Sequence, residues 1–239
     1  MRSLRDCLVC YLGFVLGTVV ILTVPVFLVS GNVRWAFNEE RLYAYGFDKY
    51  SIAESTGFRN EELLNISSQM MAYWASDEDL VDVTVRNQPL FNAREKTHLK
   101  DVKSLVLGFE MAWWVSGSVI LLCGILSMLK TPFANFDRFY RNLRTGSLLT
   151  IGLLITVGVI VLVAFRWVFI LFHRISFRTD FWQLDPKTDY LVRLFPEGFW
   201  FDAALFLGLA TLLEAVTLFA IVFLLIRMKS QRRIRGKVS

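Results

Sequence analysis

The sequence predicts an all-α polytopic membrane protein with four transmembrane helices and a small extracytoplasmic cap. Hydrophobic residues make up 55% of its 239 residues, and the mean hydropathy is positive. They gather in four runs that reach the roughly 20 residues a helix needs to cross a bilayer. Lysine and arginine are distributed unevenly between the segments that join the runs. We expect one membrane domain over residues 1–239, with spans at about 7–29, 105–129, 148–172 and 203–226.

Basic residues predict the orientation of the spans. The N-terminus before the first span, residues 130–147 and the tail at 227–239 are rich in Lys and Arg, so they should be cytoplasmic. Residues 30–104 carry nine Lys/Arg against twelve Asp/Glu, and residues 173–202 carry four against five. Because both segments lack a basic excess, we expect them to form the extracytoplasmic cap.

The net charge of +5 therefore comes from the cytoplasmic ends. A basic tail beside a span is typical of binding to anionic lipid head groups, and we expect no nucleic acid as a partner. Cys7, Cys10 and Cys123 should be packing residues, since the cap has no cysteine for a disulfide and the C-x-x-C pair lacks a βαβ context. The first run is longer than a usual signal-peptide core and ends in a poor cleavage site, which predicts a retained anchor.

The first outer segment predicts several short elements. The aromatic residues from Trp35 to Tyr50 are typical of chain at the lipid head-group level. Residues Asn60 to Ala75 have acids at their start and apolar residues near helical spacing, which indicates an amphipathic helix. Val81 to Val85 alternates weakly and favours a short strand, followed by a turn at Asn87 to Pro89. On the cytoplasmic side, residues 130–147 are expected to form an interfacial hairpin.

The two histidines of the chain are candidates for acid–base chemistry. Asn92 is expected to cap a helix that continues into the second span, with Glu95 as the reciprocal residue of a capping box. Glu95, His98 and Asp101 lie three residues apart, so we expect both carboxylates to orient an imidazole that changes charge near neutral pH. His173 ends the third span on the same side of the membrane. Whether the two histidines meet decides the function.

Ionisable residues inside the spans are a second group of candidates. Glu110 and Arg166 should each lie about 9 Å below the same outer interface, which makes them candidates for an ion pair. The pair either takes part in function or locks two helices together, and both interpretations stay open. Glu214 lies near the middle of the fourth span, where it is either protonated or bonded to a hydroxyl group such as that of Thr156 or Thr211.

Three chemistries can be built from these residues. His98, His173 and the nearby carboxylates supply enough metal ligands, but no tight ligand spacing is present, so we expect neither a metal nor a cofactor. No serine has the G-x-S-x-G context of a nucleophile. A histidine can instead take a proton from an attacking amine and return one to a leaving alkoxide, which suits acyl transfer within one substrate. Arg174, Arg178 or backbone amides are candidate oxyanion donors.

Four motifs carry a resemblance to a known family. They read P-L-F-N-A-R-E-K-T-H-L-K-D-V-K, F-H-R-I-S-F, D-F-W and L-V-R-L-F-P-E-G-F-W-F-D. Together they resemble the four-span family of bacterial membrane proteins that includes the lipoprotein intramolecular transacylase, Lit. The resemblance extends from Tyr45 to Asp202, and the two histidines of the family fall on His98 and His173.

The resemblance implies an enzyme of the plasma membrane of a Gram-positive bacterium, with its site on the outer face. It implies transfer of the sn-2 acyl chain of an S-diacylglyceryl cysteine to the α-amino group of that cysteine, which gives a lyso-form lipoprotein. His98 would be the principal acid–base residue and His173 the second histidine, while Trp182, Pro196 and Glu197 would form substrate walls. The partners would be a diacylated lipoprotein N-terminus and membrane lipid. The alternative is a non-enzymatic accessory or lipid-binding membrane protein.

Overall fold

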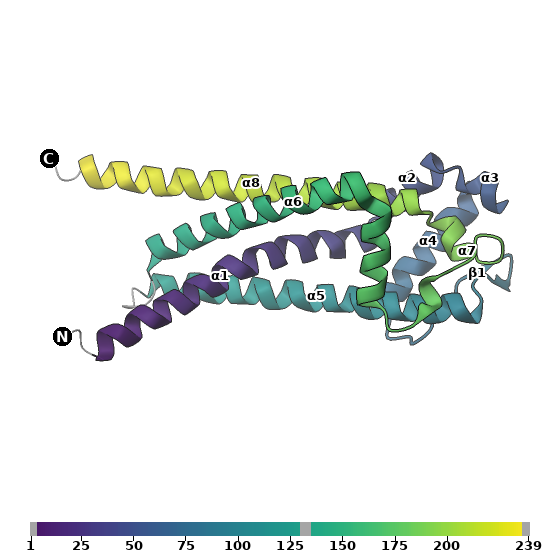
Figure 1. Cartoon of the computed structure of the whole chain (residues 1–239), viewed down its shortest axis with the longest axis horizontal. Helices are drawn as coiled ribbons and strands as arrows, with labels where there is room; N and C mark the ends of the chain where they lie inside the picture. Colours follow the sequence, from purple (N-terminus) through teal and green to yellow (C-terminus); the bar gives the residue numbers. More distant parts are fainter. Residues whose placement is uncertain (1–3, 130–134, 236–239) are drawn as a thin grey trace. The chain divides into compact units, whose positions relative to one another are not determined.

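Four long helices carry most of the chain. The computed structural model describes residues 4–129 and 135–235. Each of the four helices is long and apolar enough to cross a membrane. The predicted all-α fold with four transmembrane helices is thereby confirmed. The helices are α1 (Leu4–Phe37), α5 (Ala93–Met128), α6 (Phe136–Ser176) and α8 (Glu197–Arg235) (Figure 1).

The helices are longer than the expected spans, and where the membrane begins and ends along each one stays a prediction. Three expected spans lie within α1, α6 and α8, and the span at 105–129 ends one residue beyond α5. Residues 136–147 form the first turns of α6 instead of the expected interfacial hairpin. Apolar residues from Phe136 to Leu143 recur at helical spacing there, and several pack into a buried cluster. Residues 130–134, Arg2 and the tail after 235 lie outside the described residues.

The contacts within the chain group into two compact units. The helical unit comprises the described residues of 1–31, 111–157 and 208–239, and the cap unit comprises residues 32–110 and 158–207. In the helical unit, Val20, Val24, Leu143 and Val222 form the buried cluster. A Cβ atom on Gly146 would lie only 2.8 Å from the Cβ atom of Val24, so α1 and α6 approach each other through this glycine.

Besides parts of the long helices, the cap unit contains several short elements. The helix expected at 60–75 is confirmed as α4. The expected strand is limited to β1, which pairs with β2 across a turn at Arg86 and Asn87, where both residues have positive φ angles as tight hairpins require. The elements are α2 (Glu40–Lys49), α3 (Ile52–Thr56), α4 (Asn60–Trp74), β1 (Thr84–Val85), β2 (Gln88–Pro89), the 3-10 helix η1 (Asp180–Trp182) and α7 (Tyr190–Leu194).

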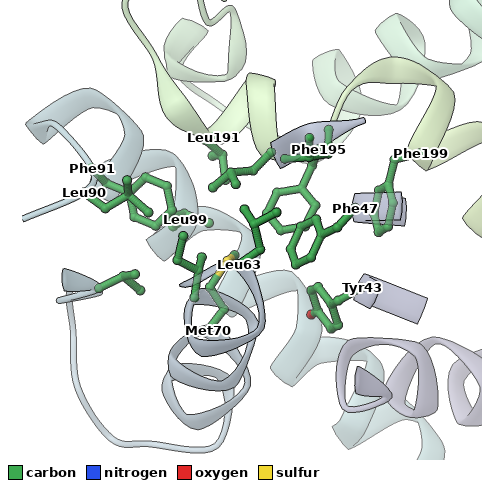
Figure 2. Close-up of a cluster of buried hydrophobic side chains, with 14 of the residues drawn as sticks. Tyr43, Phe47, Leu63, Met70, Leu90, Phe91, Leu99, Leu191, Phe195 and Phe199 are labelled. Carbon is green, nitrogen blue, oxygen red and sulfur yellow. The ribbon is translucent and has the colours of Figure 1, made fainter. Parts of the chain in front are cut away.

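The cap unit has its own hydrophobic core, which Figure 2 shows. Side chains from several short elements converge with residues of the long helices α5 and α8. Ile66 and Leu194 are completely buried, and Leu99 and Ala203 bring the two long helices into the same core. Because α5 and α8 contribute residues to this core, the cap fixes the starts of both helices. The labelled residues are Tyr43, Phe47, Leu63, Met70, Leu90, Phe91, Leu99, Leu191, Phe195 and Phe199.

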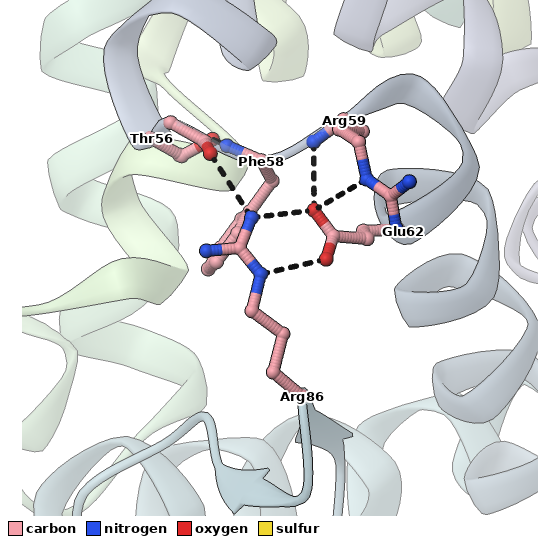
Figure 3. Close-up of polar contacts among 6 residues, drawn as sticks. Thr56, Phe58, Arg59, Glu62 and Arg86 are labelled. Atoms are coloured by element: carbon pink, nitrogen blue, oxygen red, sulfur yellow. Dashed lines mark hydrogen bonds and ion pairs between the residues drawn. The ribbon is translucent and has the colours of Figure 1, made fainter.

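A polar cluster joins the hairpin to α4, as Figure 3 shows. Arg86, in the hairpin turn, donates hydrogen bonds of 2.7 and 2.8 Å to the two carboxylate oxygens of Glu62. Glu62 also accepts a 2.9 Å bond from the backbone amide of Arg59, which caps the first turn of α4. The Arg86 guanidinium lowers the pKa of Glu62 to about 2. The bidentate pair therefore favours the ionised carboxylate.

This pKa predicts a pH-dependent contribution to stability. Because the folded-state pKa lies below the ordinary value of 4.5, the stabilisation is present above about pH 4.5 and is lost as the pH falls through about 2. We expect Glu62→Gln to lower the thermal midpoint at pH 7, with the gap to wild type closing toward pH 2. Glu61→Gln is the matched control in the same turn. A gap that is independent of pH would show that the ion pair contributes nothing.

Candidate active site

Asn92 and Glu95 begin α5 as the capping box predicts. The Asn92 side-chain oxygen accepts hydrogen bonds from the backbone amides of Arg94 and Glu95, at 2.9 and 3.0 Å. In return, a carboxylate oxygen of Glu95 accepts a 2.8 Å hydrogen bond from the backbone amide of Asn92. Reciprocal bonds of this kind satisfy amides that would otherwise lack partners at the start of a helix. They fix the first turn of α5, one turn before His98.

Glu95 has different partners from those expected. Its side chain is only 1% exposed, and its second oxygen accepts a 2.7 Å bond from the backbone amide of Leu191 in α7. Each of its oxygens thus accepts from a backbone amide. No hydrogen bond joins it to Nδ1 of His98. Glu95 connects the starts of α5 and α7, and does not orient the imidazole.

His173 lies in the stretch of α6 that follows a break in the helix. Ala164 has non-helical angles, with φ −138° and ψ 40°, and marks a kink in α6, whose ribbon bends sharply in Figure 1. In the stretch that follows, Phe165 packs edge-on against Phe201 of α8, with ring centroids 5.2 Å apart. Eight residues later, the ring of His173 lies beside that of His98 on α5. The stretch from Phe165 to Ser176 therefore links α8 to α5.

The two histidines lie side by side. Their ring centroids are 6.1 Å apart, with an angle of 35° between the rings. His98 is 7% exposed, and its Nδ1 atom is buried without a hydrogen-bond partner. It is the one such side-chain nitrogen or oxygen among residues 8–129 and 135–231, whose side chains the structure describes. A buried polar atom without a partner costs free energy, and a catalytic role is one of the reasons for which native proteins retain such an atom.

The proton position on His173 follows from its own hydrogen bond. Nδ1 of His173 lies 2.7 Å from the backbone oxygen of Phe169. A carbonyl oxygen only accepts, so Nδ1 must carry the proton, and the lone pair of the neutral ring is on Nε2. The two imidazoles are thus inequivalent: one is held by the backbone through Nδ1, and in the other that atom is free.

Aromatic rings surround the histidine pair. Phe177 lies edge-on to His98, with ring centroids 5.0 Å apart, and 5.4 Å from His173. The rings of Phe169 and Trp182 lie 4.2 and 5.0 Å from that of His173. Trp182 thus lies beside the histidine pair, and its role as a substrate wall stays a prediction. Phe169 and Phe177 were not among the predicted residues, although their spacing of four residues on either side of His173 is a signal that could have identified them.

The predicted ion pair between Glu110 and Arg166 is wrong. Glu110 pairs instead with Arg34, with 3.3 Å between Arg34 Nε and a carboxylate oxygen. Arg34 lies beyond the expected end of the first span at Val29, but α1 continues to Phe37 and keeps this arginine on the helix. Arg166 is exposed and makes no ion pair with any residue that the structure describes.

The remaining predicted residues make no hydrogen bond to the histidines within the part of the chain that the structure describes. Asp101 accepts a 3.4 Å hydrogen bond from the hydroxyl of Thr179 and does not bond to Nδ1 of His98. Arg174 follows His173 directly and is exposed. Pro196 and Glu197 lie at the start of α8, where Pro196 accepts a bond from the amide of Phe199, and no ring contact or hydrogen bond joins either of them to the histidines within the described chain. Across residues 8–129 and 135–231, whose side chains the structure describes, no cluster of three His, Cys, Asp or Glu residues suited to a metal occurs.

Comparisons with known proteins find a similar sequence and similar solved structures. A protein of Aquifex aeolicus (strain VF5), described only as uncharacterized, is 22% identical to the chain over 227 residues, which cover 93% of this chain and 97% of that protein. The in meso structure of the lipoprotein intramolecular transacylase Lit from Bacillus cereus matches with a TM-score of 0.81 at 20% identity, covering 92% of this chain and 99% of that one. A variant of the same protein with one histidine replaced by alanine matches with a TM-score of 0.76 at 20% identity, covering 92% of this chain and 96% of that one.

The structural matches establish the fold, and the family model extends the comparison to the sequence. The model described as lipoprotein intramolecular transacylase Lit matches residues 18–200. That range includes both histidines, the capping box of α5 and the break in α6. The chain therefore belongs to the lipoprotein intramolecular transacylase (Lit) family.

Proposed function

We propose that this protein moves the sn-2 acyl chain of an S-diacylglyceryl cysteine to the α-amino group of the same cysteine. The observation that carries the proposal is the buried, unpartnered Nδ1 of His98 beside a second histidine, 6.1 Å away between ring centroids. A site for acid–base catalysis needs a group within hydrogen-bond reach of the proton that moves. In this proposal Nδ1 of His98, which bonds to no other described residue, is the atom that exchanges the proton with the substrate.

The reaction balances without a protein nucleophile. The amine nitrogen attacks the ester carbonyl, a C–N bond forms, and His98 takes the proton that the amine loses. The C–O bond to the glyceryl oxygen then breaks, and His98 returns the proton to that alkoxide. Because the amine and the ester belong to one molecule, holding the substrate in the reactive geometry supplies much of the rate.

His173 is proposed to assist through Nε2. Its Nδ1 proton is engaged by the Phe169 carbonyl, so the ring orientation is set before the substrate binds. Nε2 is then free to hydrogen-bond to the amine or to the imidazolium that forms on His98. Arg174 and Arg178 are exposed and make no ion pair with a described residue, so they remain candidates to stabilise the oxyanion.

The aromatic surroundings suit chemistry on a lipid. Rings of Phe169, Phe177 and Trp182 pack against the imidazoles and limit the access of water to the reacting ester. We further propose that the protein lies in the bacterial plasma membrane, with both termini in the cytoplasm and the histidines on the outer face. The distribution of lysine and arginine between the joining segments supports this orientation.

A bacterial strain that lacks lipoprotein N-acylation provides the test. The chain is expressed there, and the N-termini of its lipoproteins are analysed by mass spectrometry. We expect N-acyl, S-monoacylglyceryl cysteine in cells with the wild-type chain and diacylglyceryl cysteine with a free amine in cells carrying the empty vector. Diacylglyceryl cysteine alone, in cells whose membranes contain the wild-type protein, would contradict the proposed function and leave a non-enzymatic role.

A further inference from the structure

Two residues flank His98 on its own face of α5. Arg94 lies one turn before it and Asp101 lies about one turn after it, so the three side chains follow one stripe of the helix. Neither flanking residue hydrogen-bonds to Nδ1 of His98. Their bonds go to another part of the chain. Arg94 Nη2 donates a 2.9 Å bond to the backbone oxygen of Asp180, and Asp101 accepts from the hydroxyl of Thr179 at 3.4 Å.

Both bonds hold the segment Arg178–Leu184, which we call the strap. The strap follows α6 and contains η1, whose last residue is Trp182. Internal bonds preserve its shape, because the amides of Gln183 and Leu184 donate to the backbone oxygens of Asp180 and Trp182, at 3.1 and 3.0 Å. The strap is thus a turn with its own backbone hydrogen bonds, and two side chains of α5 bond to it.

The strap places Trp182 against the histidine pair. The Trp182 ring lies 5.0 Å from that of His173, between centroids. No residue of η1 is buried. The two bonds to α5 are also exposed, and the longer one, at 3.4 Å, exceeds the usual range for hydroxyl donors. Each is a single exposed hydrogen bond, so losing either one should loosen the strap measurably while Leu184 stays packed against the core of the cap unit.

We propose that Arg94 and Asp101 are positioning residues that hold the strap closed, so that Trp182 forms a wall of the histidine site. This inference rests on the proposed function and names residues through which that site is assembled. Asp101 acts here as a hydrogen-bond acceptor for Thr179, and its charge is not required by His98. Arg94 acts through the carbonyl of Asp180.

The two possible roles of Asp101 respond differently to substitution. Asp101→Asn keeps a side-chain oxygen that accepts from Thr179, whereas Asp101→Ala removes it. Thr179→Ser keeps the hydroxyl donor and Thr179→Val removes it. A role through charge on His98 would instead make Asp101→Asn as harmful as Asp101→Ala and would shift the pH–rate profile.

The experiment measures initial rates of acyl transfer on a synthetic diacylglyceryl lipopeptide with the purified full-length protein. We expect Arg94→Ala, Asp101→Ala and Thr179→Val each to lower kcat/KM about 5-fold, the effect of losing one hydrogen bond, with an unchanged pH profile. Asp101→Asn and Thr179→Ser should recover most of the rate. Combining Asp101→Ala with Thr179→Val should add little, since both remove the same bond. Lys96→Ala is the control. Lys96 lies in the same turn of α5 as Arg94, but its charge pairs with Asp82 and not with the strap.

A second measurement does not depend on activity. Hydrogen exchange at the amides of Gln183 and Leu184 should be faster in Arg94→Ala and Thr179→Val than in wild type, and unchanged in Lys96→Ala. Wild-type rates and wild-type exchange in both strap variants would overturn the inference. So would an impaired Asp101→Asn with an altered pH profile. If wild type transfers no acyl chain while exchange responds as expected, the proposed function fails and the strap remains a conformational element.

Discussion

Replacing His98 with glutamine should lower the rate of acyl transfer by about 10² to 10⁴, the range usual for losing a general acid–base group. Glutamine fills much of the same space and hydrogen-bonds, but it neither takes up nor releases a proton near neutral pH. The fold should therefore be retained while proton transfer is lost. The measurement is the initial rate with a synthetic diacylglyceryl lipopeptide, together with the mass of the lipoprotein N-terminus in cells.

His173→Gln is the companion variant for this prediction. It loses the ring whose Nδ1 donates to Phe169, and we expect a smaller reduction than for His98→Gln because it assists and does not carry the proton. Thermal unfolding of both variants in detergent should stay close to that of wild type. Full activity of a well-folded His98→Gln protein would remove His98 from the mechanism and would point to His173 as the base.

Replacing Glu95 with alanine should lower the free energy of unfolding by about 3 kcal/mol, since two amides lose their acceptor and each such loss costs about 1–3 kcal/mol. These amides belong to Asn92 and Leu191, so α5 and α7 both lose a terminal partner. The expected result is a lower thermal midpoint and faster proteolysis of the cap unit. Differential scanning fluorimetry and limited proteolysis measure the two effects.

Glu95→Gln separates this role from a catalytic one. The amide side chain keeps one acceptor oxygen, so we expect a smaller loss of stability than with alanine and near-normal chemistry in the folded fraction. A Glu95→Gln protein of wild-type stability without activity would contradict the structural role. It would support the original expectation that Glu95 orients His98.

Much of the fold could be predicted from the sequence because lipid leaves few alternatives to a helix. In lipid, the backbone amides and carbonyls of the four long apolar runs must hydrogen-bond within each run, so the runs predict four transmembrane helices. The start of α5 was equally readable, because Asn92 and Glu95 form a capping box through local bonds. The proximity of His98 and His173 was only a hypothesis, supported by charge distribution and motif resemblance.

Contacts between distant segments were harder to predict. Glu110 pairs with Arg34. The sequence places Arg34 beyond the first span, because the apolar run ends before the helix does. Glu95 reaches the amide of Leu191, 96 residues away, and no local pattern indicates that contact. The break at Ala164 also lacks a local signal, because alanine is a strong helix former and neither glycine nor proline lies beside it.

The break at Ala164 separates the direction of the His173 side chain from the rotation of the helix before it. In a continuous helix, inserting one residue rotates every later side chain by about 100° around the axis. At Ala164 the helical phase is reset, and the stretch that follows takes its rotation from contacts at Phe165 and His173. The direction of the imidazole therefore follows from contacts made after the break, with Phe201 and His98, and needs no continuous helical register from the residues before Ala164.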